Sequence, residues 1–279
     1  MTTAEHRLPT RQLLQPDLPE FDPGALDQQT RDALAELLLT MADDEFIVGF
    51  WDSEWTGIAP MLEEDVAWSS IAQDEIGHAR LLYEMLGRLT GQDPDRLAFH
   101  REPGEYRHAS LVDHPRNDWA FSIARRWMYE YQDALRLGAL AGSSFKPLAD
   151  VVGKIRREER YHLMHVDTWL RRLANGGPDS RSRLQDAMNK IRPDAHSVLT
   201  PLVTEKQLLD AGILAEPFEA LQEKFSAFAV ATVVDDLGFE FAGKGVHPGN
   251  RDRSEPSESF LWLWGEFTSV ARLEEGVTW

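Results

Sequence analysis

The chain has 279 residues, and its 47 aspartates and glutamates against 29 lysines and arginines give a formal net charge of −18 at pH 7. It contains no cysteine, which excludes disulfides, thiolate zinc sites, iron–sulfur clusters held by this chain and a thiol nucleophile. Because such a charge repels phosphate backbones and anionic lipids, and no run reaches the ~20 apolar residues of a membrane span, we expect a cytoplasmic protein that binds neither nucleic acid nor membrane.

The predicted elements follow residues 1–24, where four prolines and little periodicity indicate an extended arm. From there apolar residues recur at helical spacing, which predicts a single helical domain over residues 25–279. Its core bundle, residues 27–175, is expected to contain four long helices, at residues 27–56, 60–90, 115–141 and 146–174. Shorter helices in the C-terminal region 179–273 are expected at residues 179–191, 217–242 and 257–273. No alternating strand pattern is long enough to predict a sheet, so the fold class is all-α.

The second and fourth helical stripes each carry a glutamate and a histidine three residues apart. These pairs are Glu75 with His78 and Glu159 with His162, and positions i and i+3 of a helix point to one side. A third Glu-x-x-His string, at residues 105–108, lies in a segment broken by glycine and proline, and we interpret it as coincidence.

The first and third stripes each carry a lone glutamate, Glu45 and Glu130. Glu45 lies as far before the first predicted turn as Glu75 lies after it, and Glu130 and Glu159 straddle the second predicted turn in the same way. The antiparallel helices of a hairpin bring such positions to the same depth. Two hairpins would therefore supply four carboxylates and two imidazoles to one bundle interior.

Four glutamates on apolar stripes need a compensating charge, because buried carboxylates are costly and repel one another. Two divalent cations would cancel the four charges, and carboxylate with imidazole ligands suits iron or manganese. The same donor set occurs in ferritin-like di-iron and di-manganese bundles. We therefore predict a dinuclear site in a ferritin-like four-helix bundle, with the ligands Glu45, Glu75, His78, Glu130, Glu159 and His162. The alternative is a group of hydrated or paired carboxylates without metal.

Further acids near these positions are candidates for orienting the ligands. Asp74 and Glu158 each lie four residues before the histidine of their own helix, so each could accept its second N–H from one turn away. Asp133 follows Glu130 by nearly one turn, and is another orienting acid, the third-helix ligand in place of Glu130, or a surface acid. In the same way, Asp44 could be the ligand of the first helix in place of Glu45.

The remaining conspicuous residues have simpler interpretations. His165 is interpreted as an ordinary partly buried histidine, and Trp127 as a core residue. Arg125 and Arg126 are interpreted as solvated arginines, with an acidic partner or a phosphorylated ligand as the alternative. The aromatic run at residues 260–264 has apolar residues on more than one face, so we expect it to pack against its own bundle or a partner protein.

Several segments carry a resemblance to a known family: QDEIGHARLLYEML, IRREERYHLMHVDTWLRRLANG, DAMNKIRP, GKGVHP, and a C-terminus that runs from FLWLWGEFT to Trp279. On these segments the chain resembles the ferritin-like subunits of bacterial phenylacetyl-CoA 1,2-epoxidase. The PaaC-type subunit is the nearest match, over about residues 27–279.

This resemblance implies a multicomponent di-iron monooxygenase that uses O₂ to epoxidise the aromatic ring of phenylacetyl-CoA in phenylacetate degradation. It implies a heterodimer with a catalytic PaaA-type subunit, further epoxidase subunits, and a separate flavin and iron–sulfur reductase. The metal would be two iron ions, with manganese possible, and this chain would hold neither flavin nor iron–sulfur cluster. Carried over residue by residue, the family's metal ligands fall on the six residues predicted above.

The resemblance leaves the role of this protein in the complex open. Familiar PaaC-type chains have lost parts of the ligand set, whereas both Glu-x-x-His pairs and both lone glutamates are present here. The chain is therefore either an active part of the oxygenase or a non-catalytic scaffold with a vestigial or structural metal site. A third interpretation is another ferritin-like di-metal oxidase or an iron-handling protein, which the long C-terminal additions disfavour.

Overall fold

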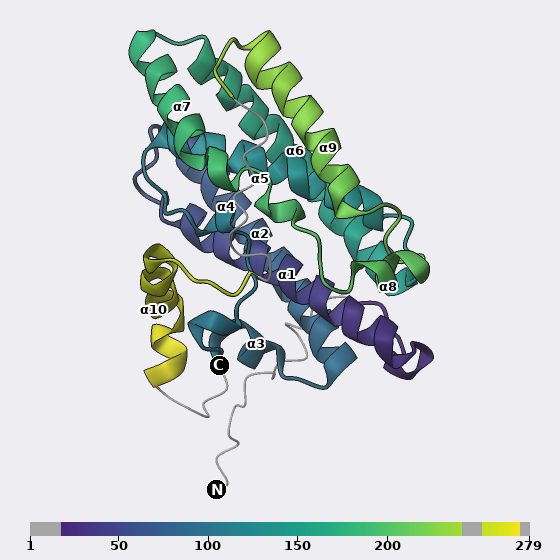
Figure 1. Ribbon diagram of the computed structural model, residues 1–279. Coiled ribbons are helices and arrows are strands. Elements are labelled where there is room, and N and C mark those ends of the chain that lie inside the picture. The colour runs from purple at the N-terminus through teal and green to yellow at the C-terminus, as the bar shows by residue number, and fades with distance from the viewer. Residues whose placement is uncertain (1–17, 242–252, 274–279) are drawn as a thin grey trace, which may run out of the picture.

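The computed structural model describes residues 18–241 and 253–273, and every regular element within these ranges is helical (Figure 1). The predicted all-α, ferritin-like fold is confirmed. Its four long helices are α1 (Gln28–Ser53), α2 (Leu62–Thr90), α5 (Trp119–Leu140) and α6 (Lys146–Ala174). Residues 1–17 of the predicted arm, the GKGVHP segment and Trp279 lie outside the described residues. The division into an arm and one domain remains a prediction.

Local signals set the ends of the long helices close to where the sequence predicts them. Asp27 caps α1, because its side chain accepts a hydrogen bond from the backbone N–H of Thr30 (3.0 Å). Gly91 ends α2 in the left-handed conformation, at φ 77°. Helix α5 begins four residues later than predicted, because Asn117 has φ 53° and Asp118 provides the N-cap by accepting from the N–H of Phe121.

The four long helices form two hairpins, α1 with α2 and α5 with α6, and α2 packs beside α6 (Figure 1). Between the hairpins, the segment after α2 contains α3 (Pro94–Phe99), the short turn η3 (Pro103–Glu105) and α4 (Ser110–Asp113). This arrangement places the predicted glutamate and histidine positions of α2 and α6 next to each other.

The C-terminal region covers the second hairpin and one end of the first. It contains α7 (Pro178–Ile191), η4 (Arg192–Asp194), η5 (Ser197–Leu199), α8 (Glu205–Asp210), α9 (Phe218–Ala229), the π-helical η6 (Val230–Asp236) and α10 (Glu258–Leu273). Helices α7 and α9 pack on α5, whereas α10 lies beside α3 at the other end of the molecule (Figure 1). The helix predicted at 217–242 is shorter than expected, since regular helix stops at Asp236.

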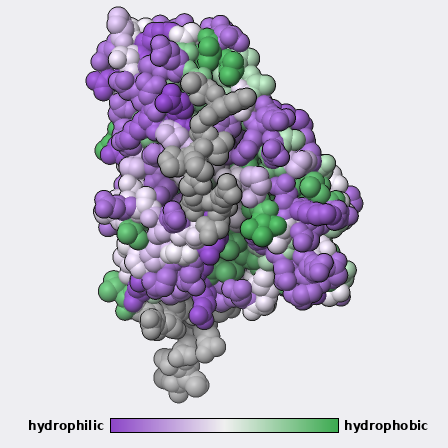
Figure 2. Space-filling model, in the orientation of Figure 1, coloured by the Kyte–Doolittle hydropathy of each residue, from purple (hydrophilic) through white to green (hydrophobic). Residues whose placement is uncertain are grey.

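A large hydrophobic core surrounds the long helices. The predicted core residue Trp127 is fully buried, as is Trp68. On α10, Phe260 and Leu263 are buried against the bundle while Trp262 is half exposed, so the aromatic run packs on its own chain through one face. The surface in Figure 2 is mostly hydrophilic with scattered apolar residues. Among the described helices, none combines the length and apolar composition needed to cross a bilayer.

Candidate metal centre

The six predicted ligands converge in the bundle interior as two overlapping groups. Site A consists of Glu45, Glu75, His78 and Glu159, and site B consists of Glu75, Glu130, Glu159 and His162. Within each group the potential ligand atoms all lie within 4.8 Å of one another, and every residue is buried. The two sites share a glutamate from α2 and a glutamate from α6.

A close approach of α1 to α2 brings their acids together. A Cβ atom at Gly49 would lie 3.0 Å from Cβ of Glu75 and 3.1 Å from the carbonyl oxygen of Ala72. Only glycine allows the two helices to come this near without a shift. Because Glu45 lies one turn before Gly49, this contact sets the depth at which Glu45 meets Glu75.

Both histidines point Nδ1 toward the carboxylates. His78 Nδ1 lies 3.3 Å from Oε1 of Glu159 and 3.6 Å from Oε2 of Glu45. His162 Nδ1 lies 2.9 Å from Oε1 of Glu75 and 3.3 Å from Oε1 of Glu159. The carboxylate of Glu159 therefore faces both rings and is the natural bridge between the two sites.

The outer nitrogens of the two rings reach acids on the opposite helix. His78 Nε2 lies 2.8 Å from Oε2 of Glu158 on α6, and His162 Nε2 lies 3.3 Å from Oδ2 of Asp74 on α2. The expectation that each acid serves the histidine of its own helix is wrong. Each ring projects from its helix toward the neighbouring one, so its far nitrogen arrives beside the acid that precedes the neighbour's ligand glutamate.

Site A contains buried ligand atoms without a hydrogen-bond partner among the described residues. These atoms are both carboxylate oxygens of Glu45, Nδ1 of His78, Oε2 of Glu75 and Oε1 of Glu159. Native proteins satisfy nearly all buried polar atoms, and leaving them unpaired is costly. Three carboxylates and one imidazole arranged in this way fit a divalent transition-metal ion.

The electrostatics of the site show that it needs positive charge. Burial and the charge of Glu75 raise the pKa of Glu45 well above its ordinary value. Burial opposes protonation of His78, but its contacts with Glu159 and Glu45 outweigh burial and raise its pKa well above 6.5. Protons thus compensate the carboxylates of the metal-free chain, and a bound metal ion would displace them.

An arginine that was not predicted to belong to the site lies in site B. Arg126 Nε donates to Oε1 of Glu130 (2.6 Å), Nη2 contacts Oε1 of Glu75, and Nη1 donates to Oδ2 of Asp52 (3.0 Å). Arg125 also pairs with Asp52, and neither arginine has exposed surface. The interpretation of these two arginines as solvated is wrong, because the buried Asp52 of α1 supplies their counter-charge.

The sequence shows which of these side chains share a helix face, but not which of them pair across helices. Arg126 precedes Glu130 by four residues, a spacing that brings side chains together on a helix, and Asp52 lies on the same α1 stripe as Glu45. Burial opposes ionisation of Glu75, but Arg126 together with hydrogen bonds to Glu45 and His162 outweighs burial and lowers the pKa of Glu75 to about 2. Burial keeps the pKa of Glu130 well above its ordinary value despite the same arginine.

The alternative ligand candidates are engaged elsewhere. Asp133 Oδ1 accepts hydrogen bonds from Nε (2.8 Å) and Nη2 (2.5 Å) of Arg136. Asp44 accepts from Nη1 of Arg136 (2.6 Å) and from Nη1 of Arg253 (2.9 Å). Neither belongs to the two donor groups, whereas Glu130 and Glu45 do. The structure thus places the glutamates, rather than these aspartates, at the centre.

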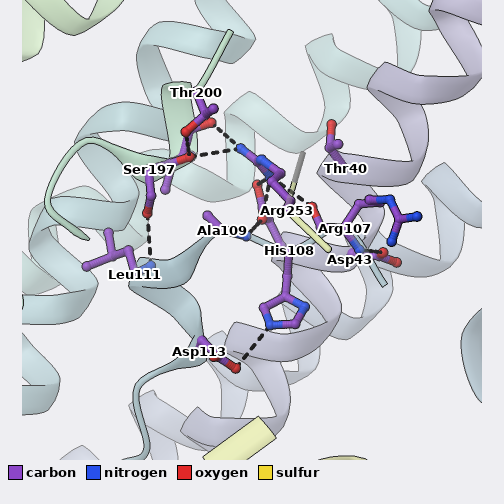
Figure 3. Close-up of polar contacts among 12 residues, drawn as sticks. Thr40, Asp43, Arg107, His108, Ala109, Leu111, Asp113, Ser197, Thr200 and Arg253 are labelled. Carbon is purple, nitrogen blue, oxygen red and sulfur yellow. Dashed lines mark hydrogen bonds and ion pairs between the residues drawn. The ribbon is translucent and has the colours of Figure 1, made fainter. Parts of the chain in front are cut away.

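Arg253 ties the C-terminal part of the chain to this network, donating also to the carbonyl oxygen of Ser197 (3.1 Å; Figure 3). Nearby, the histidine of the third Glu-x-x-His string, His108, pairs with Asp113 at 3.0 Å (Figure 3), away from the donor groups. His165 bonds Glu64 across α2 and α6 at 2.6 Å, and it too lies outside both donor groups.

Comparison with known proteins gives consistent matches. The family model described as "Phenylacetic acid catabolic protein" matches residues 22–279. The chain is 31% identical over 224 residues to the C subunit of 1,2-phenylacetyl-CoA epoxidase of Escherichia coli K12, covering 77% of this chain and 90% of that protein. It is 26% identical over 150 residues to the A subunit of the same epoxidase, covering 54% of this chain and 48% of that protein.

Proposed function

Because the chain belongs to the phenylacetic acid catabolic protein family, we propose that it is a PaaC-type subunit of a cytoplasmic phenylacetyl-CoA epoxidase with a metal centre of its own. The match to the C subunit of the Escherichia coli epoxidase supports this type, since it covers most of both chains. The weaker match to the A subunit supports a heterodimeric partner that is related to this chain. The full assembly would include further epoxidase subunits and a separate reductase.

The buried donors of site A carry the metal part of the proposal. Five ligand atoms there are buried without a hydrogen-bond partner among the described residues, in a cluster that burial alone would make unstable. The proposed centre lies among Glu45, Glu75, His78, Glu130, Glu159 and His162, and the proposed metal is iron, with manganese as the alternative. When bound, such a metal supplies redox and O₂ chemistry that protein side chains lack.

The chain's own residues would hold and shield this centre. Glu158 and Asp74 fix the ring orientation of the two histidines and keep Nδ1 directed inward. The complete burial of Glu45, Glu75 and Glu130 excludes bulk water from the site. Because the chain has no cysteine to bind an iron–sulfur cluster, reducing electrons must come from another protein.

A structural role in the same complex is the second candidate function. The observation that favours it is the ion-pair network of Arg125 and Arg126 with Asp52, Glu75 and Glu130, which neutralises part of the acidic cluster without metal. In that case phenylacetyl-CoA would be bound and epoxidised by the PaaA-type partner, and this chain would support the assembly.

Metal content tests the centre. The purified chain is loaded anaerobically with Fe²⁺ or Mn²⁺, desalted and analysed for metal, beside the double variant Glu75→Ala with Glu159→Ala. We expect bound metal in the wild type and none in the variant, since the two glutamates serve both sites. The control is Glu63→Ala with Glu223→Ala, the same chemical change at exposed positions. A wild type that stays metal-free would refute the proposed centre.

Turnover separates the two candidate functions. The complete complex is reconstituted with its PaaA-type partner, reductase, phenylacetyl-CoA and O₂, using wild-type chain or the Glu75/Glu159 variant. A loss of epoxide formation with a folded, assembled variant supports an active metal centre here. Unchanged turnover would assign the chain the structural role alone.

A further inference from the structure

We infer that Arg126 is a built-in counter-cation at site B, so that the chain binds one divalent metal ion, at site A, and not two. The inference rests on the proposed metal centre and divides it into two unequal positions. Its basis is the placement of one guanidinium group among ligand atoms that the sequence pattern assigns to a second metal ion.

The guanidinium lies where an ion at site B would have to lie. Arg126 Nη2 contacts Oε1 of Glu75, lies 2.5 Å from Oε1 of Glu130 and lies 3.3 Å from Nδ1 of His162. These are three of the four residues of site B. A metal ion needs ligand distances of about 2.0–2.2 Å to oxygen and imidazole nitrogen, so it would compete with Nη2 for one small volume.

The distribution of unpaired atoms matches this asymmetry. At site A, both oxygens of Glu45 and Nδ1 of His78 are buried without a hydrogen-bond partner among the described residues. At site B, Oε1 of Glu130 and Nδ1 of His162 each face a nitrogen of Arg126, and of the atoms of these two residues only Oε2 of Glu130 is buried without a hydrogen-bond partner among the described residues. Arg126 therefore satisfies most of site B and leaves the donors of site A free for a metal ion.

Charge balance points the same way. Two divalent ions would neutralise the four glutamates completely, which would leave the fully buried Arg126 with Asp52 as its only counterion. Arg125 already claims that aspartate, at 2.6 Å. Arg126 would then share Asp52 with Arg125 and would have no further counterion in a region without solvent. Burying such an uncompensated charge is strongly unfavourable. With one divalent ion, Arg126 keeps its carboxylate partners.

The test counts Mn²⁺ ions per chain by elemental analysis and by the EPR spectrum, in wild type and in Arg126→Met. The wild type should bind one ion per chain and show the hyperfine pattern of an isolated ion. The Arg126→Met variant, which keeps the length of the side chain but removes its charge, should bind two ions and show the spectrum of a coupled pair. Arg126→Lys should still bind one.

Arg125→Met is the matched control, since it removes a neighbouring buried arginine that pairs with Asp52 but touches neither metal site. It should leave the count at one. Two ions in the wild type at saturating Mn²⁺ would overturn the inference even if Arg126→Met fails to fold. One ion in a folded Arg126→Met variant would overturn it as well. No ion in any of these proteins would refute the metal centre of the proposed function, which is a different outcome.

Discussion

The crossed contacts between histidines and acids make a quantitative prediction for Glu158. Its Oε2 lies 2.8 Å from Nε2 of His78, and this bond fixes the ring whose Nδ1 faces site A. Removing a partner that orients a ligating histidine typically costs about 10–100-fold in metal affinity. We predict that Glu158→Ala weakens metal binding at site A.

The structure places the effect at the low end of that range. The side chain of Glu158 is 42% exposed, so water can replace part of the lost hydrogen bond. The expected loss is therefore about tenfold, or about 1.4 kcal/mol. Asp74→Ala is the matched control, because Asp74 is equally exposed but contacts His162 at a longer 3.3 Å. It should change affinity at site A by less than about threefold.

Two measurements check this prediction. Competition against a chelator gives the metal affinity of wild type, Glu158→Ala and Asp74→Ala. NMR of ¹⁵N-labelled histidine rings in the metal-free proteins identifies which ring loses its partner. Glu158→Ala should shift the ring nitrogens of His78 and leave those of His162 in place. The opposite pattern, with His162 affected, would refute the crossed arrangement and restore a contact within α6.

Three further predictions concern packing, buried charge and pH. Gly49→Ala should lower the free energy of unfolding by about 1–3 kcal/mol and weaken metal binding, because the added Cβ would push α1 away from α2 beside Glu75. The control is Gly153→Ala, where an added Cβ has nothing within 4 Å and should be neutral or stabilising. Thermal unfolding and metal titration of both variants check this prediction. Asp44→Asn should cost about 3–5 kcal/mol and lower Tm by on the order of 10 °C, because two buried arginines lose a counterion, whereas Asp210→Asn at an exposed ion pair should change Tm little. Burial lowers the pKa of His196, so below about pH 6.5 this histidine binds a proton more readily in the unfolded chain than in the folded chain. The free energy of unfolding of wild type, compared with that of His196→Asn in chemical denaturation, should therefore fall as the pH is lowered from 7.5 toward 5.5.

Each of these has a contrary outcome. Equal effects of Gly49→Ala and Gly153→Ala would mean that the helix contact does not set the site. A negligible cost of Asp44→Asn would mean that its arginines find other partners. For His196, the deciding result is a stability difference that stays constant with pH.

The sequence predicted the ligand set because helical periodicity and hairpin symmetry are local properties. Spacing of three and four residues places Glu75 with His78, and Glu159 with His162, on one face of each helix, and equal distances from a turn place Glu45 opposite Glu75. These relations hold in any antiparallel hairpin, so the pairing of donors within each hairpin follows from the sequence, whereas the convergence of the two hairpins on one site needs the packing of α2 against α6. Composition likewise excluded an iron–sulfur cluster held by this chain, since the chain lacks cysteine.

Tertiary structure alone decided which charges neighbour those ligands. Periodicity gives the face of a helix but not what lies opposite it, so it could not show that Asp52 of α1 holds Arg125 and Arg126 inside the bundle. Nor could it show that the acids beside the histidines act across the α2–α6 contact. Both sets of contacts depend on the directions in which long side chains extend between the helices. In the buried interior, charged groups pair with the nearest opposite charge in space, whatever its position in the sequence. The candidate ligand set can thus be predicted from the sequence, whereas the position of Arg126 among these residues is a property of the packed bundle.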